Sequence, residues 1–135
     1  EKTGKITITH PDMTRFWITL KQVSNFVLQS ISEMQGGEIF VPKMPSANIT
    51  TMASVIVPGY VKVKYSGMRP GEKLHETLIT KEEDLRLEQN EIRYVIAQTE
   101  NDIVPFPIEF AQEYRSDNNE KWLTHDQIKE MIENG

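Results

Sequence analysis

The alternation of apolar and polar positions predicts several short strands in this chain. Residues 5–9 alternate Ile with Thr at the period of two that is typical of a strand, and residues 60–65 alternate in the same way. Residues 38–42 form a short apolar run that ends at a proline, as strands often do. Two further alternating runs flank residues 89–91, and this arrangement predicts a hairpin.

A second pattern, with apolar residues at every third or fourth position, predicts the first helix. Thr19 and Gln22 mark its start, because they have the spacing of a capping box. The apolar positions of the pattern are Leu20, Val23, Val27, Ile31 and Met34. Their spacing predicts one buried helix face, and Gly36 and Gly37 predict the helix end.

The capping spacing occurs twice more. Thr80 precedes Glu83, and Thr124 precedes Gln127 at the start of a terminal helix predicted for residues 125–133. Each pair places a hydroxyl and a side-chain acceptor where they can bond to the first free backbone N–H groups of a helix.

Three other segments complete the expected elements. Residues 72–79 predict a short helix, and residues 99–110, which contain two prolines, predict extended backbone. Residues 50–57 are ambiguous between helix and strand because their apolar residues are few and partly β-branched, and we favour helix. Together the elements predict an α/β fold, or α+β when this chain is taken alone, with three or four strands and several short helices.

Size and composition predict a single domain over residues 1–135. The chain has 135 residues, of which 38% are apolar, and this is enough for one modest core. The sequence begins without Met and enters a strand pattern almost at once, which favours a piece cut from a longer polypeptide.

Charge and cysteine content narrow the expected partners and location. The net charge of -5, with no basic stripe, disfavours a nucleic-acid partner. The absence of cysteine excludes disulfides and Cys-ligated zinc, and fits the cytoplasm. No apolar run approaches the ~18 residues needed to span a bilayer, and the first ten residues lack the apolar core of a signal peptide. We therefore expect a chain without a membrane partner.

One pair of residues imitates a catalytic signature. Tyr60 and Lys64 have the Y-x-x-x-K spacing in which a lysine lowers the pKa of a catalytic tyrosine. That pairing needs a helix, whereas four residues of a strand span roughly 13 Å. Because the pattern here predicts a strand, we interpret it as a strand with one wet face. The sequence also lacks zinc-site histidine spacing and the glycine motifs that bind dinucleotides or triphosphates.

Two arginines are the remaining candidates for chemistry. Arg15 lies in the segment DMTRFW, and Arg69 lies in SGMRPGEKLHE, where Pro70 and Gly71 stiffen the backbone. The planar guanidinium matches phosphate oxygens, and a stiff backbone reduces the entropy lost on binding, so the two residues could clamp a diphosphate. Glu72 could accept hydrogen bonds from vicinal hydroxyls.

An alternative needs no ligand. Arg15 would pair with Asp12, and Arg69 would pair with a nearby carboxylate, as ordinary surface salt bridges.

Four segments occur in order along the chain: ITITHPDMTRFWITL, GGEIFVPKMPS, RPGEKLHETLI and SDNNEKWLT. Together they resemble the C-terminal region of the inverting UDP-N-acetylglucosamine 4,6-dehydratases, bacterial polysaccharide-biosynthesis enzymes of the extended short-chain dehydrogenase class. The resemblance runs from Lys5 to the C-terminus, although MASVIVPGY departs from the longer helix usual there. It implies an enzyme of two parts: an N-terminal Rossmann part that binds NADP and carries the catalytic residues, and a C-terminal part that binds the UDP-sugar.

This chain matches only the second part, so the resemblance implies no catalytic, cofactor or metal residue here and no turnover by the chain alone. In the family the two arginines contact the nucleotide diphosphate and the acidic residue meets the ribose, roles that fall on Arg15, Arg69 and Glu72. The strand before the first arginine offers backbone groups to uracil, which implies Thr7 and Thr9. The partners implied are a UDP-sugar, the missing Rossmann part and, since family members often form oligomers, further copies of the parent.

Two other functions stay open. A UDP-sugar 4-epimerase of the same lineage has similar segments, although WITL, VPK and SDNNEKWL look more like the dehydratase. The chain could also be a non-enzymatic binding or assembly module that joins a partner through its FPIEF and KWLT segments.

Overall fold

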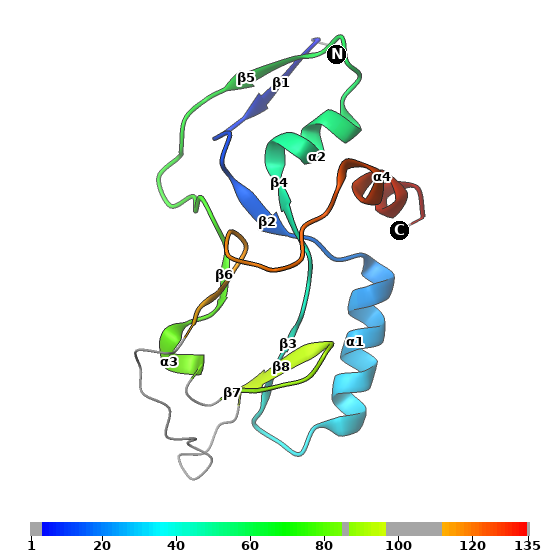
Figure 1. Cartoon of the computed structure of the whole chain (residues 1–135), viewed down its shortest axis with the longest axis vertical. Helices are drawn as coiled ribbons and strands as arrows, with labels where there is room; N and C mark the ends of the chain where they lie inside the picture. Colours follow the sequence, from blue (N-terminus) through cyan, green and yellow to red (C-terminus); the bar gives the residue numbers. More distant parts are fainter. Residues whose placement is uncertain (1–3, 85–86, 97–111, 135) are drawn as a thin grey trace. The chain divides into compact units, whose positions relative to one another are not determined.

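The computed structural model describes residues 4–84, 87–96 and 112–134, which form nine short strands and four helices (Figure 1). In chain order these are β1 (Lys5–Ile8), β2 (Thr14–Phe16), α1 (Leu20–Glu33), β3 (Ile39–Pro42), β4 (Ser46–Asn48), α2 (Ile49–Ile56), β5 (Lys62–Tyr65), β6 (Thr77–Ile79), α3 (Lys81–Asp84), β7 (Leu87–Gln89), β8 (Arg93–Ile96), β9 (Tyr114–Arg115) and α4 (His125–Asn134). This mixture of helices and strands agrees with the predicted α/β class. The chain forms two compact units, which are described separately.

Unit 1 comprises Glu1–Trp17, Pro45–Glu76 and Ser116–Gly135. Strand β1 pairs in parallel with β5, and β2 pairs antiparallel with β4. Helix α2 begins directly after β4, where the Asn48 side chain accepts the Thr50 N–H, and it packs against α4. The buried apolar side chains of this unit are Ile8, Met13, Ala47, Ala53 and Ile128.

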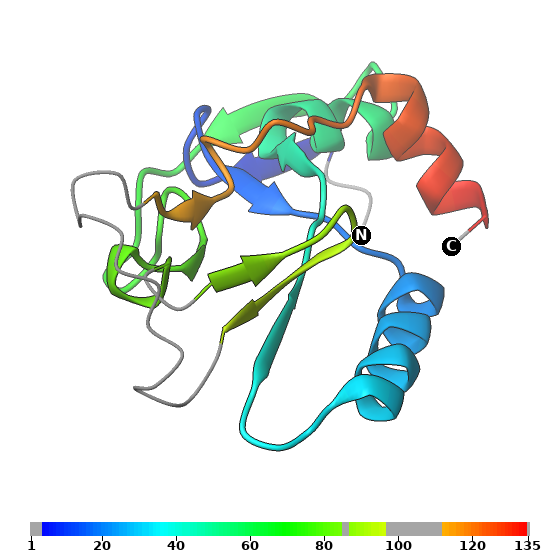
Figure 2. The ribbon, with the colours of Figure 1, turned by 60° about the horizontal axis from the view of Figure 1, so that its bottom comes forward.

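Unit 2 comprises Ile18–Met44 and Thr77–Arg115. Its main sheet has the order β3-β8-β7 and is antiparallel throughout, with β7 and β8 forming the predicted hairpin (Figure 2). A second pair joins β6 to β9. Arg93 on β8 forms an ion pair with Glu33 at the end of α1, and its guanidinium lies 4.9 Å from the centre of the Phe40 ring.

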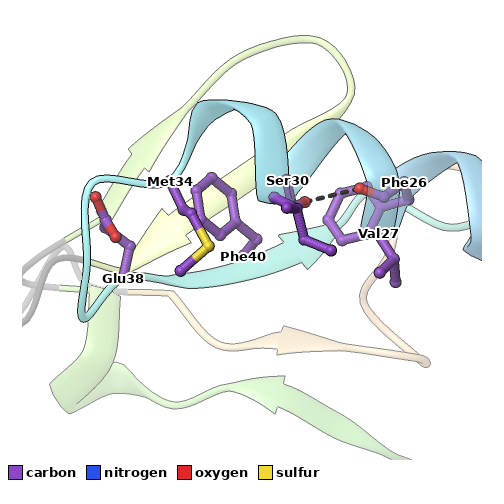
Figure 3. A pocket seen from close by; sticks show the side chains of 7 residues that line it. Phe26, Val27, Ser30, Met34, Glu38 and Phe40 are labelled. Carbon is purple, nitrogen blue, oxygen red and sulfur yellow. Dashed lines mark hydrogen bonds between the residues drawn. The ribbon is translucent and has the colours of Figure 1, made fainter.

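The predicted burial of one face of α1 is wrong for the described part of the chain. The helix has no buried residue, and Leu20, Ile31 and Met34 are 82%, 61% and 53% exposed. Val27 and Met34, with Phe26, Ser30, Ile31, Glu38 and Phe40, line a shallow apolar groove (Figure 3). The periodicity identified the apolar face correctly, but no described element of unit 2 covers it.

The local signals for helices are confirmed. Thr19 and Gln22 form both hydrogen bonds of a capping box, and the helix that follows ends at Glu33, a few residues before the predicted glycines. The two other capping pairs also form both bonds, at the starts of α3 and α4. The segment that was ambiguous between helix and strand is helix α2.

Two predictions about elements are wrong. Residues 72–79 form bends and then β6 rather than a helix, because the backbone of Glu76 bonds to Ser116 and not to a residue four positions earlier. The described residues contain nine strands rather than three or four, since strands of two to four residues are too short to show alternation. The extended segment 99–110 lies outside the described residues, and the single domain stays a prediction.

Candidate functional site

The loop that carries Arg69 follows directly from the parallel pair of strands in unit 1. The pairing of β1 with β5 continues into it, since the N–H groups of Ser66 and Gly67 donate to the carbonyls of Ile8 and Thr9 at 3.0 and 3.1 Å. The loop therefore begins at the carboxyl end of a strand, where ligand-binding loops are common. Two hydrogen bonds to β1 fix its starting point.

Arg69 begins a tight turn whose geometry explains the residues that follow it. The Glu72 N–H donates to the Arg69 carbonyl at 3.1 Å, which closes a four-residue turn. Pro70 stands at the second position and Gly71 at the third, with φ of 81°. This is the pattern of a type II turn, which needs a left-handed residue at the third position and so favours glycine there. The segment RPGE thus encodes the turn.

The Glu72 carboxylate closes the same turn from its other side. One oxygen accepts the Arg69 N–H at 3.0 Å, and the other accepts the Thr9 hydroxyl at 3.0 Å. The hydrogen bond from the Arg69 N–H is the main reason that the pKa of Glu72 lies below its ordinary value. Partial desolvation opposes this, while the Thr9 hydroxyl and the positive charges of Arg69 and Arg15 lower the pKa further.

Arg15, on β2, holds the next part of the loop. Its Nη1 atom donates to the carbonyls of Thr14 at 2.6 Å and Leu74 at 3.2 Å, and its Nη2 atom donates to the Lys73 carbonyl at 2.9 Å. Its Nε atom lies 3.3 Å from a carboxylate oxygen of Glu76. The alternative of a salt bridge to Asp12 is therefore wrong, although Arg15 does form an ion pair within the chain. One of the two N–H groups on Nη2 has no partner among the described residues.

Arg69 differs from Arg15 in that its side chain is exposed. In the described part of the chain no acceptor contacts the Arg69 guanidinium, because Glu72 bonds to the backbone N–H of Arg69 instead. The alternative of an intramolecular salt bridge is thus not formed among these residues. The turn holds a cationic side chain on a fixed backbone and leaves it open to solvent.

The two threonines have different settings. Thr9 uses its carbonyl for Gly67 and its hydroxyl for Glu72, so it belongs to the same cluster as the arginine turn. Thr7 is exposed on β1, two residues earlier, and no described hydrogen bond joins it to the other candidates. Strand β1 pairs with β5 on one side only, within the described residues, which leaves backbone groups available along its other edge. The structure therefore brings together Thr9, Arg15, Arg69 and Glu72.

Sequence reasoning missed a buried polar network behind this loop. The Thr14 hydroxyl lies 2.8 Å from Nδ1 of His75 and 2.7 Å from the Ser116 hydroxyl, which also accepts the Glu76 N–H at 2.9 Å. His75 is 3.8 Å from Asp117 through its other ring nitrogen. Thr14 and Ser116 are 4% and 0% exposed, so neither hydroxyl is placed to attack a substrate. The network attaches the start of the SDNNEKWLT segment to the loop. The only sequence signal for this attachment was that the segment is one of the four on which the resemblance rests.

The same C-terminal segment is tied to β4. The Ser46 N–H donates to the Lys121 carbonyl at 2.8 Å, the Leu123 N–H donates to the Ser46 carbonyl at 2.8 Å, and Asn119 donates its side-chain amide to the Ser46 hydroxyl at 3.0 Å. The Trp122 indole N–H donates to the Asn119 carbonyl. Through these hydrogen bonds, the polar residues of the SDNNEKWLT segment hold it against β4.

The other chemical candidates carry no site in the described residues. Lys64 lies on β5 and Tyr60 lies in the turn before it, so the helical geometry of the Y-x-x-x-K signature is absent there. No three His, Asp or Glu side chains among the residues described are grouped to hold a metal ion. Within the same residues, the longest apolar helix is too short to cross a bilayer.

The sequence matches a known family over most of its length. The family described as polysaccharide biosynthesis protein matches residues 1–98. This chain belongs to that family. The polysaccharide biosynthesis family includes enzymes of the branch that the four segments resemble, and the match confirms the resemblance to the C-terminal region of that branch.

Individual relatives of the polysaccharide biosynthesis family extend the comparison. An uncharacterized membrane protein of Methanocaldococcus jannaschii is 40% identical over 71% of this chain and 32% of its own length. An inverting UDP-N-acetylglucosamine 4,6-dehydratase of Campylobacter jejuni is 36% identical over 98% of this chain and 43% of its own length. A UDP-glucose 4-epimerase of Rickettsia conorii is 30% identical over 97% of this chain and 42% of its own length.

A solved structure supports the fold. The X-ray structure of Pen from Bacillus thuringiensis superposes with a TM-score of 0.80 at 28% identity, covering 98% of this chain and 41% of that one. The chain therefore spans 32% to 43% of the length of these relatives.

Proposed function

We propose that this chain is the nucleotide-sugar-binding portion of an NADP-dependent, 5-inverting UDP-N-acetylglucosamine 4,6-dehydratase of bacterial surface polysaccharide biosynthesis. The observation that carries this proposal is the exposed Arg69 guanidinium on a turn that Glu72 closes from both sides. An exposed guanidinium on an ordered backbone, with no acceptor among the described residues, is suited to bind a phosphate oxygen pair. The similarity to the Campylobacter jejuni dehydratase over 98% of the chain supports the choice of ligand.

The contacts follow from the donors that remain free. Arg69 offers its whole guanidinium to the diphosphate, whereas Arg15 offers the one N–H group on Nη2 that the loop carbonyls do not use. Glu72 has both oxygens engaged once, and each retains acceptor capacity for a ribose hydroxyl. The free edge of β1 near Thr7 and Thr9 offers backbone groups to uracil. Arg69 is therefore the main anion-binding side chain, and Arg15 chiefly supports the loop.

The rest of the reaction belongs to the longer enzyme. There a Rossmann part outside this chain would hold NADP, which would supply the hydride chemistry for a dehydration across sugar C5 and C6 with inversion at C5. The residues of this chain bind and orient the UDP-sugar, and we expect the purified 135-residue chain to show no turnover. The complete enzyme acts as a homo-oligomer.

Titration with UDP tests the proposal directly. UDP added to the ¹⁵N-labelled chain should shift the amide signals of the Arg69 turn and of β1, and Arg69→Ala should weaken binding about 10- to 100-fold, as expected for the loss of a bidentate diphosphate contact. Lys73→Ala is the matched control, because Lys73 is an exposed cation of the same loop that bonds to Arg15 only through its backbone carbonyl. Equal losses for both variants would show a general charge effect and contradict the proposed contact.

A UDP-sugar 4-epimerase is the second candidate. The Rickettsia conorii epimerase matches 97% of the chain at 30% identity, and a UDP-binding portion would serve either reaction. The longer protein decides between them when it is given UDP-N-acetylglucosamine and NADP. A dehydratase yields a 4-keto-6-deoxy sugar that has lost one water, whereas an epimerase yields a product of unchanged mass.

A further inference from the structure

Both polar groups of the Arg69 backbone, its N–H and its carbonyl, form hydrogen bonds to the same residue. The Arg69 carbonyl accepts the Glu72 N–H at 3.1 Å, and the Arg69 N–H donates to the Glu72 carboxylate at 3.0 Å. The other carboxylate oxygen accepts the hydroxyl of Thr9, which lies 63 residues earlier on the end of β1. Glu72 thus joins the turn to the strand that starts the site.

The contacts of Glu72 suggest a role different from direct ligand recognition. Arg69 and Arg15 are both near enough to lower the pKa of Glu72, yet neither guanidinium forms a hydrogen bond to it among the described contacts. The carboxylate instead bonds to a backbone N–H and a neutral hydroxyl. It therefore orders the backbone of Arg69 without occupying the donors of its guanidinium.

We propose that Glu72 is a positioning residue that acts through Arg69: its carboxylate holds the turn and β1 together, so that the backbone carrying the Arg69 guanidinium is ordered before an anion binds. This proposal rests on the proposed function for the identity of the anion, a nucleoside diphosphate. The order of the turn itself is a property of the free chain. Without the carboxylate, Arg69 would have to be ordered during binding, and that entropy would be lost from the affinity.

The first test uses the free chain. Hydrogen exchange of the Arg69 amide should accelerate about tenfold or more in Glu72→Ala, because its acceptor is lost. Glu72→Gln should stay within about threefold of the wild type, since an amide oxygen can accept the Arg69 N–H while the amide NH₂ donates to Thr9. Equal protection in Glu72→Ala and the wild type would overturn the proposal.

Thr9 supplies an independent pair of variants. Thr9→Ser keeps the hydroxyl that donates to Glu72, and Thr9→Val removes it at nearly the same volume. Thr9→Val should accelerate exchange at Arg69 and Thr9→Ser should not. This pair decides the question if Glu72→Ala fails to fold, and identical behaviour of the two Thr9 variants would contradict the proposed link to β1.

The second test compares two probes, UDP and inorganic pyrophosphate, which lacks a ribose. If Glu72 acts through Arg69, Glu72→Ala weakens pyrophosphate binding about 5- to 20-fold and UDP binding at least as much, since UDP also loses its ribose contact, and it causes no further loss of pyrophosphate affinity in an Arg69→Ala background. If Glu72 acts only by binding ribose, UDP weakens and pyrophosphate does not, and the proposal is wrong. Additive losses of pyrophosphate affinity in the double variant would also overturn it.

The two tests separate the failure of this inference from the failure of the proposed function. A wild-type chain that binds neither probe, but whose Arg69 exchange depends on Glu72, would refute the ligand and confirm the ordering of the turn. A chain that binds both probes, but whose Arg69 exchange ignores Glu72, would support the ligand and refute the positioning role.

Discussion

The two units of the chain differ in how far their described residues provide partners for buried polar groups and cover apolar side chains. In unit 1 the loop with Arg69 is held by β1, by Arg15 and by the Ser116 network, and its buried polar side chains have partners. In unit 2 the apolar face of α1 is open to solvent. Among the described residues, the buried side-chain atoms without a hydrogen-bond partner are Nε and Nη1 of Arg93, also in unit 2.

The difference separates two kinds of element: one whose hydrogen-bond partners are all described, and one whose apolar face has no cover among the described residues. The turn of unit 1 is formed from residues that are all present, so its geometry is complete. Helix α1 begins with a local signal, its capping box, and at its end Glu33 forms an ion pair with Arg93, 60 residues away in sequence. Its apolar face needs a covering surface for stability, because packing of an amphipathic face stabilises a helix more than propensity does.

Core truncation should show the contrast most strongly. Ile128 on α4 is fully buried in unit 1, and Ile128→Ala should reduce the free energy of unfolding by about 2–5 kcal/mol through lost burial and a cavity. Ile31→Ala on α1 is the matched change at a side chain that is 61% exposed, and it should cost less than about 1 kcal/mol in this chain. Urea unfolding of both variants measures the difference. Comparable large losses would mean that a surface covers α1 in solution.

Removal of helix caps should give a smaller contrast. Thr19→Ala and Thr124→Ala each remove a hydroxyl that accepts a first-turn N–H, at a cost of about 1 kcal/mol. Helix α4 is also anchored by buried Ile128, whereas α1 has no buried residue. Hydrogen exchange should therefore accelerate along most of α1 in Thr19→Ala, but only in the first turn of α4 in Thr124→Ala. Local fraying of the same extent in both helices would remove this distinction.

Local chemistry is what the sequence predicted well. Capping pairs, the RPGE turn and the strand of residues 5–9 depend on neighbours within a few positions, and each is found where the sequence placed it. The helix predicted for residues 72–79 failed because the hydrogen bonds of Glu76 go to Ser116, 40 residues later. Arg15 was identified as a candidate ligand of a diphosphate, but the sequence did not predict that its guanidinium donates to the carbonyls of Leu74 and Lys73, 59 and 58 residues away in sequence. Partners at such separations leave no periodic signal.

The carboxylates of Glu72 and Glu38 offer the subtlest comparison of the two units. Each closes a turn by accepting backbone N–H groups: Glu72 takes that of Arg69, and Glu38 takes those of Gln35 and Gly36 at 2.9 and 2.7 Å. The hydrogen bond from the Arg69 N–H lowers the pKa of Glu72 below the ordinary value of 4.5. The pKa of Glu38 is lowered chiefly by a hydrogen bond from its own backbone N–H and then by those from Gly36 and Gln35. Because folding lowers each pKa, the stabilisation is present above the unfolded value and is lost as the pH falls through the folded value.

An acid titration followed by amide chemical shifts should show a lowered pKa for both carboxylates, but protonation of Glu72 should affect residues farther away in sequence than protonation of Glu38. Protonation of Glu38 should move only the amides of Gln35, Gly36 and Glu38 itself, since all its described bonds lie within one turn. Protonation of Glu72 should move the amide of Arg69 and also signals of Thr9, because its second oxygen accepts the Thr9 hydroxyl. The midpoints of both titrations should lie below pH 4.5, and Glu72→Gln should abolish only the transition seen at Arg69 and Thr9. If the Thr9 signals do not move while the Arg69 amide titrates, the Glu72 carboxylate bonds only within its own turn, as that of Glu38 does. The two units would then differ only in the burial of apolar side chains.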